Sequence, residues 1–151
     1  MARGPENTFI ASVHRKIPKG KPYWMKNHNA YIGGPADVWY SGNEGDVWVE
    51  YKYTHRLPPI INLLDRKKKY CLSALQEEWL NDRYAEGRRV FVILGFEYGG
   101  VIFRDREWNR PHPASSLSQY TRQDIAKWII NETMGLYDVP SKPRKGLERC
   151  I

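Results

Sequence analysis

The 151-residue chain is expected to fold as one α/β domain, with a central mixed β-sheet flanked by helices. Three observations predict this class. Helix and strand patterns alternate in the order helix, strand, strand, helix, strand, strand, helix. The segment RVFVILGFE (89–97) is almost continuously apolar, as in a central strand covered on both faces. The apolar content of 41% argues against disorder, and no run approaches the roughly 20 apolar residues of a membrane span.

Turn and cap signals define the elements in the first half of the chain. Pro5 suits the first turn of a helix, which is expected to run until Pro18. Residues 18–30 are predicted to be a basic loop. Two strands, ADVWY (36–40) and DVWVEYKY (46–53), flank the turn signal SGNEG, so we expect them to form a hairpin.

The second half begins with a proline-containing connection (54–70). A helix from Ser73 to Glu86 should follow and stop at Gly87, a residue that favours helix ends. The apolar run at 89–97 is the next strand, and GGVIFRD (99–105) is a short further strand. After a loop rich in Arg, Pro and Ser, the spacing of apolar residues predicts a last helix near 121–134.

The net charge of +7 is unevenly distributed. Residues 1–36 and 56–69 contain six and five Lys or Arg residues, whereas residues 37–55 contain four acids and one lysine. Basic segments on both sides of an acidic centre suggest a polyanion, such as nucleic acid, held around a metal-binding pocket. The alternative is a solvated basic surface. Residues 136–151 form a basic C-terminal tail.

Acidic residues interrupt the two apolar strands of the hairpin. Glu50 and Lys52 are two residues apart and therefore share a face of their strand. Asp37 begins the preceding strand, so Asp37 and Glu50 can converge at one end of the hairpin. Together with the main-chain carbonyl of Tyr51, they would form a hard, oxygen-rich site suited to Mg²⁺ or Mn²⁺. The alternative is an exposed Glu–Lys pair on a solvated strand.

The segments GGPADVW (33–39) and WVEYK (48–52) resemble the PD-(D/E)xK nuclease superfamily. The glycine-rich start and LSALQ (72–76) are most similar to its VRR-NUC branch of small stand-alone viral and bacterial nucleases, which is related to archaeal Holliday-junction resolvases. The resemblance implies a restriction-endonuclease-like domain with a core at about 5–135. It also implies a Mg²⁺-dependent (or Mn²⁺-dependent) endonuclease, of the kind found in phages, that acts as a homodimer on branched DNA.

The resemblance also implies roles for individual residues. Asp37, Glu50 and Glu6 would bind the metal with the Tyr51 carbonyl, while Lys52 and Gln76 would complete the catalytic site. Two of these assignments have alternatives. Glu6 could be a first-turn acid that favours the helix N-terminus. Gln76 could be the third residue of a capping box that starts at Ser73.

Two basic segments are candidate DNA contacts, and the first interleaves lysines with aromatic residues. Their residues are Lys16, Lys19, Lys21, Tyr23, Trp24 and Lys26 in the first segment, and Arg66, Lys67, Lys68 and Lys69 in the second. The alternative for Tyr23 and Trp24 is that they anchor a loop. The second segment belongs to a connection of twenty residues (53–72) that is longer than in the resembling nucleases. It could be a substrate-binding insertion or a dimer contact built on Ile60, Ile61, Leu63 and Leu64.

Other function classes remain open. The chain could be a non-catalytic nucleic-acid-binding module with a nuclease fold, or a protein-interaction factor with an acidic partner. Within the nuclease class, a nicking or general DNA endonuclease is the alternative to a junction-selective one. Cys71 and Cys150 are too few for a disulfide framework or a zinc site. The start MARGPENTF lacks the apolar core of a signal peptide, so a cytoplasmic protein is expected, in the host cytoplasm if it comes from a phage.

Overall fold

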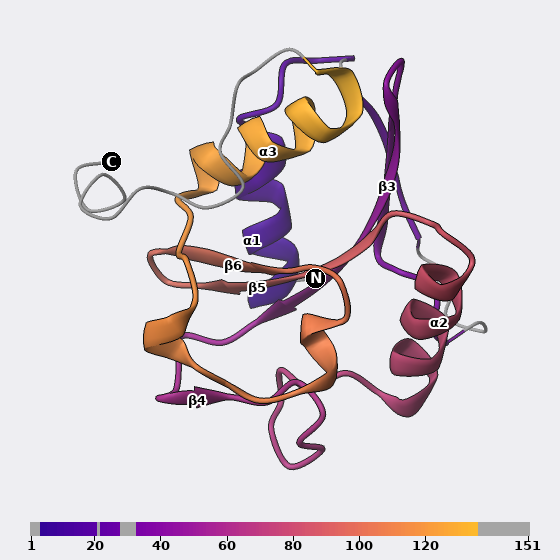
Figure 1. Cartoon of the computed structure of the whole chain (residues 1–151). Coiled ribbons are helices and arrows are strands. Elements are labelled where there is room, and N and C mark those ends of the chain that lie inside the picture. The colour runs from indigo at the N-terminus through magenta and orange to yellow at the C-terminus, as the bar shows by residue number, and fades with distance from the viewer. Residues whose placement is uncertain (1–3, 21, 28–32, 136–151) are drawn as a thin grey trace.

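A five-stranded mixed β-sheet with helices on both faces forms the centre of the computed structural model (Figure 1). The structure describes residues 4–20, 22–27 and 33–135. Its elements are α1 (Pro5–His14), β1 (Tyr23–Lys26), β2 (Val38–Gly42), β3 (Gly45–Tyr53), β4 (Ile60–Ile61), α2 (Ala74–Ala85), β5 (Val90–Phe96), β6 (Gly99–Phe103), β7 (His112–Pro113) and α3 (Arg122–Met134). Among the described residues, every helix is too short or too polar to cross a membrane.

The strands follow the order β1-β2-β3-β5-β6. The pair β3–β5 is parallel, and the other neighbours are antiparallel. Parallel neighbours need a crossover connection, which here includes α2. The predicted fold class, a mixed sheet flanked by helices, is confirmed.

Each face of the sheet has its own hydrophobic core. On one face α1 and α3 cover the buried side chains of Val47, Val49 and Tyr51. On the other face, α2, the connection before it and the segment after β6 build a second core around Leu63, Leu72, Leu80 and Trp108. Figure 1 shows α1 and α3 together on one side of the strands, and α2 apart from them. The alternation predicted for β3 is therefore observed.

Gly95 explains how closely α1 approaches the sheet. A Cβ atom at this position would lie 2.7 Å from the ring of Phe9, which is a steric clash. The apolar run of β5 thus contains a glycine because the first helix packs directly over it.

Several predicted boundaries differ from the observed ones, and the first hairpin strand, expected at 36–40, spans Val38–Gly42. Residues 18–30 were expected to be a loop, but residues 23–26 form β1, an edge strand paired antiparallel with β2. The sequence pattern for this strand was weak, because a strand of four residues places only two side chains on each of its faces. The first helix ends at His14 rather than continuing to Pro18, and Lys16 and Ile17 instead form i→i+3 turns. Pro18 disfavours helical geometry at the residue before it.

The connection at 53–72 folds onto its own chain. Its β4 pairs with β7, and Ile61 and Leu63 are fully buried in the second core. Of the residues considered for a dimer contact, Ile60 is exposed, at 54%. A dimer contact built on all four apolar residues is therefore wrong, because intramolecular packing already buries two of them.

A chain of buried polar groups joins α1 to the sheet. The Tyr40 and Tyr51 hydroxyls lie 2.6 Å apart, and the Tyr40 hydroxyl lies 2.8 Å from His14 Nε2. Burial, together with the charge of Lys26, lowers the pKa of His14 to about 4, so the imidazole is neutral at neutral pH. Each hydroxyl is thus hydrogen-bonded despite complete burial, as the cost of desolvation requires.

Replacing Tyr40 with phenylalanine tests this network. The Tyr40→Phe variant should lose about 1–3 kcal/mol of unfolding free energy, since Tyr51 and His14 would each lose a partner. Urea unfolding measures the loss. The matched control is Tyr23→Phe, which removes a hydroxyl from a ring that is 58% exposed. Equal stability of the two variants would contradict the prediction.

Candidate active site

The hairpin register brings Asp37 and Glu50 to the same place. Val38 pairs with Val49, so Asp37 and Glu50 are the next residues toward one end of the β2–β3 pair. The Tyr51 amide donates a hydrogen bond to Asp37 Oδ2 at 2.9 Å, which ties the carboxylate to β3. The convergence expected from the sequence is therefore present.

Gly34 allows the segment before Asp37 to lie against the start of α2. Its φ is +114°, which only glycine adopts easily, and a Cβ there would lie 3.1 Å from the Leu75 carbonyl oxygen. The Gly-Gly-Pro segment is thus a close-packed turn that places Asp37 near the N-terminal end of α2.

Glu50 is a buried carboxylate with a specific set of partners. It is 1% exposed, and its Oε2 lies 3.5 Å from Lys52 Nζ and accepts a hydrogen bond from Gln76 Nε2 at 3.1 Å. Its Oε1 is buried and accepts no hydrogen bond from the described residues. Burial, and then the charge of Asp37, raises the pKa of Glu50 well above its usual range.

Both interpretations of Gln76 agree with the structure. Its side-chain oxygen accepts from the Ser73 amide at 2.9 Å, and the Ser73 hydroxyl accepts from the Gln76 amide at 3.1 Å. This is a capping box at the start of α2. Because the box uses the oxygen, the Gln76 Nε2 group is left to donate to Glu50.

Glu6, in the first turn of α1, belongs to the same electrostatic environment. Burial, followed by the charge of Asp37, raises the pKa of Glu6 to about 7, while Lys52 and Lys26 lower it. Within residues 4–20, 22–27 and 33–135, no group of three or more Asp, Glu, His or Cys side chains is arranged to hold a metal. Metal binding by Asp37, Glu50 and Glu6 therefore stays a prediction.

The donor set fits a hard divalent cation. Asp37 and Glu50 supply carboxylate oxygens, one of which is buried without a hydrogen-bond donor. Burying such an oxygen costs folding free energy unless a cation or a proton binds to it. Oxygen donors are the ligands that Mg²⁺ and Mn²⁺ prefer.

The first predicted DNA-binding group is spread along α1 and β1. Lys16 and Lys19 are exposed beyond the C-terminal end of α1, whereas Glu6 lies in its first turn, roughly 15 Å away along the helix. Lys21 lies outside the described residues. Tyr23 is exposed, but Trp24 packs on His14 at 4.5 Å between ring centroids, which agrees with the anchoring alternative.

Lys26 also contacts a residue of α1, which the sequence did not indicate. Its Nζ donates to Asn7 Oδ1 at 3.1 Å, and its charge acts on both Glu6 and His14. The antiparallel pairing of β1 with β2 places Lys26 opposite Val38, next to Asp37. Recognising YWMK as a strand would have predicted this position.

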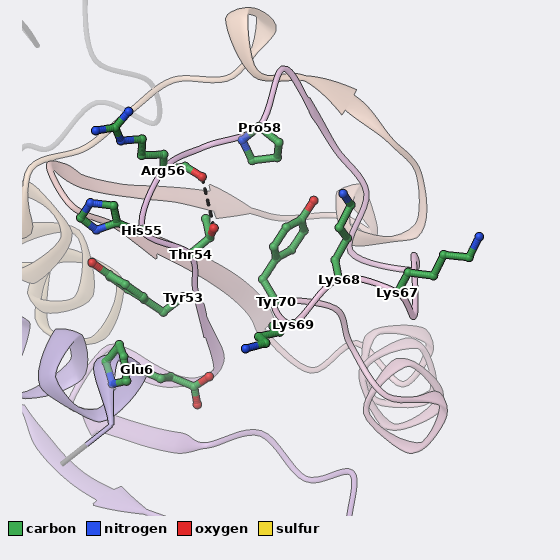
Figure 2. Close-up of a pocket in the computed structure, with 11 residues that line it drawn as sticks. Glu6, Tyr53, Thr54, His55, Arg56, Pro58, Lys67, Lys68, Lys69 and Tyr70 are labelled. Atoms are coloured by element: carbon green, nitrogen blue, oxygen red, sulfur yellow. Dashed lines mark hydrogen bonds between the residues drawn. The ribbon is translucent and has the colours of Figure 1, made fainter. Parts of the chain in front are cut away.

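The second predicted group, residues 66–69, lies near the candidate site. Arg66 pairs with Glu77 at 3.1 Å. The next three lysines are exposed and line a pocket that also includes Glu6 (Figure 2). The structure thus places the lysine run beside Glu6, although the two are separate in sequence.

Comparisons with known proteins support the fold. No family model matches the chain, and no curated protein matches it. Among solved structures, the chain is similar to Archaeoglobus fulgidus Hjc, described as a Holliday junction resolvase from an archaeal hyperthermophile. The TM-score is 0.51 at 14% identity, over 82% of this chain and 97% of that one. At this identity the likeness establishes a shared fold: a mixed sheet flanked by helices, as in this resolvase.

Proposed function

We propose that the protein is a Mg²⁺-dependent (or Mn²⁺-dependent) endonuclease that hydrolyses DNA phosphodiester bonds. The observation that carries this proposal is the Asp37–Glu50 pair at the end of a hairpin, with Lys52 on the same strand face as Glu50. The pair occurs in a fold shared with a Holliday junction resolvase. It also corresponds to the residues on which the PD-(D/E)xK resemblance rests.

Asp37, Glu50 and the Tyr51 carbonyl would hold the cation, with Glu6 as a further ligand. When bound, the cation would polarise the scissile phosphodiester and lower the pKa of a water molecule. The buried Glu50 oxygen without a hydrogen-bond donor supports this assignment, because a ligand there would satisfy it. The raised pKa of Glu50 supports it as well, since a bound cation would offset both of its causes, burial and then the charge of Asp37.

Lys52 would act on the attacking water or on charge that develops at the phosphate. Its side chain is 12% exposed, and the ion pair with Glu50 limits its freedom. An ammonium held in advance loses less entropy when the substrate binds. Gln76 would act through Glu50, by holding Oε2 in position.

Branched DNA is the proposed substrate, with a Holliday junction as the first candidate. The similar structure is named as a resolvase of such junctions, and the net charge of +7 suits a nucleic-acid ligand. Symmetric cutting of a junction requires two active sites, which a two-fold homodimer provides. The proposed assembly is therefore a homodimer.

A cleavage assay tests the enzyme. End-labelled four-way junction, flap, duplex and single-stranded DNA would be incubated with Mg²⁺, Mn²⁺ or EDTA. The wild type should cut with either metal, and Glu50→Gln and Lys52→Ala should each lose at least about 100-fold in rate, since each group acts on the reacting centre. Glu78→Gln, which removes an exposed acid from α2, is the matched control.

Cutting in EDTA, or full activity in Glu50→Gln, would contradict the proposed site. A folded wild type that binds DNA and cuts none of the four substrates would favour a non-catalytic binding module. Equal rates on all four would favour a general endonuclease over a junction-selective one.

The two contacts of Gln76 can be separated by mutation. Ser73→Ala and Gln76→Ala should each weaken the capping box and cost about 1 kcal/mol in unfolding free energy. Gln76→Ala alone should also lower the cleavage rate by about 10–100-fold, because it removes the donor to Glu50. Unfolding free energies and cleavage rates measured on both variants would decide whether Gln76 has one role or two. Equal cleavage rates would leave Gln76 with the capping role alone.

The raised pKa of Glu6 predicts a pH-dependent stability in metal-free buffer. The folded protein retains a proton on Glu6 that the unfolded chain releases at about pH 4.5, so stability falls as pH rises from about 4.5 to 7. Glu6→Gln should remove this contribution. The variant should therefore gain stability relative to the wild type at pH 8, and the gain should shrink at pH 5.

Urea unfolding in EDTA at both pH values measures the difference. Comparing the variant with the wild type at each pH removes the part of the Glu50 contribution that does not depend on the charge of Glu6. A gain of the same size at both pH values would contradict the pKa assignment.

A further inference from the structure

The pocket that contains Glu6 is built by three segments of the chain (Figure 2). These are the first turn of α1, residues 53–58 directly after Lys52, and the lysine run with Tyr70. The pocket has a volume of about 640 Å³. Tyr53, which lines the pocket, directly follows Lys52 on β3, so the pocket lies next to the strand that carries the candidate active site.

Cations without acidic partners surround this pocket. Arg56, Lys67, Lys68 and Lys69 are exposed, and within the described part of the chain none of them forms an ion pair. Arg66, directly before the run, is in contrast paired with Glu77. The unpaired cations are therefore available to an anionic ligand.

The lysines are held on an ordered turn. The Lys67 amide donates to Asp65 Oδ1 at 3.1 Å, and the Lys68 amide donates to the Asp65 carbonyl at 3.0 Å. Leu63 and Leu72 anchor both ends of this turn in the second core and are joined by a main-chain hydrogen bond of 2.7 Å. The cations thus lie on a fixed support, which lowers the entropy lost when a ligand binds.

The lining combines these cations with Tyr53, which is half-buried, whereas Tyr70 is only 6% exposed and packs in the second core. Cations that follow a phosphate backbone, together with aromatic groups near the bases, are typical of sites for single-stranded nucleic acid. The pocket is open to solvent, and its volume of about 640 Å³ has room for one or two nucleotides of a strand that lies across it. A base-paired segment could contact only the rim, because its bases are held inside the helix.

We propose that this pocket binds an unpaired strand of DNA next to the scissile phosphate. The cations contact its backbone, and the exposed part of Tyr53 lies beside a base. This inference rests on the proposed nuclease function for its location and extends it to the kind of strand that the enzyme holds. An enzyme that uses this site should prefer a flap, which exposes a single strand beside the cut, to the fully paired four-way junction that is the first candidate substrate.

Binding of a fluorescein-labelled oligothymidylate of about 12 nucleotides, followed by anisotropy in EDTA, tests the pocket without any cleavage. One variant carries Lys67→Gln, Lys68→Gln and Lys69→Gln. The control carries Arg88→Gln, Arg110→Gln and Lys127→Gln, which removes the same charge from sites that do not line the pocket. A labelled duplex of equal length and unlabelled thymidine monophosphate as competitor complete the set.

The lysine variant should bind the single strand about 10-fold more weakly, and its salt dependence should fall by a slope of about 2, since three phosphate contacts are lost. The control should change by at most about 2-fold, and the duplex affinity of the lysine variant should fall less than its single-strand affinity. Monophosphate should compete poorly, because one nucleotide satisfies few of the cations.

Three results would overturn the proposal. They are an equal loss in both variants, a loss for duplex as large as for single strand, and displacement of the strand by monophosphate at similar concentration. The outcome is separate from that of the nuclease test. If the protein cuts DNA but the lysine variant binds the single strand as well as the control does, the nuclease function stands and the strand site is wrong. If the lysines bind the single strand but the protein cuts no DNA, the strand site stands and the nuclease function is wrong.

Discussion

The burial of one carboxylate constrains much of this structure. Glu50 is almost completely inaccessible, and a charged group there is costly unless its oxygens are paired. The chain supplies Lys52 from the same strand and Gln76 from α2. Asp37 is added at the same end of the sheet, although its charge opposes that of Glu50. Two neighbouring carboxylates, one of them buried, favour a cation at the site and make the stability of the metal-free protein depend on pH.

The fold provides this arrangement through the parallel pairing of β3 with β5. That pairing requires a crossover, and the crossover places the start of α2 against the end of β3. The capping box that begins the helix also holds the amide that contacts Glu50. Helix initiation and the positioning of the carboxylate therefore depend on the same side chain.

The opposite face of the sheet serves stability. There α1 packs over Gly95 and joins the hydroxyls of Tyr40 and Tyr51 through His14. Tyr51 connects the two faces, because its ring is buried on this side while its amide binds Asp37. Packing beneath α1 thus holds the strand that carries the site.

The sequence by itself determined the three helices, the central apolar strand and the hairpin, because these are signalled by local periodicity and turn chemistry, and it singled out Asp37, Glu50 and Lys52 as candidates. It identified Gln76 and Glu6 but left their roles open, since a side chain's partner across the fold is not a local property. Tertiary structure decided that the connection before α2 buries Ile61 and Leu63 and carries its lysines to Glu6. It also decided that residues 23–26 form an edge strand, and that Trp24 packs on His14. These outcomes depend on contacts between segments far apart in the chain, which no short stretch of sequence encodes.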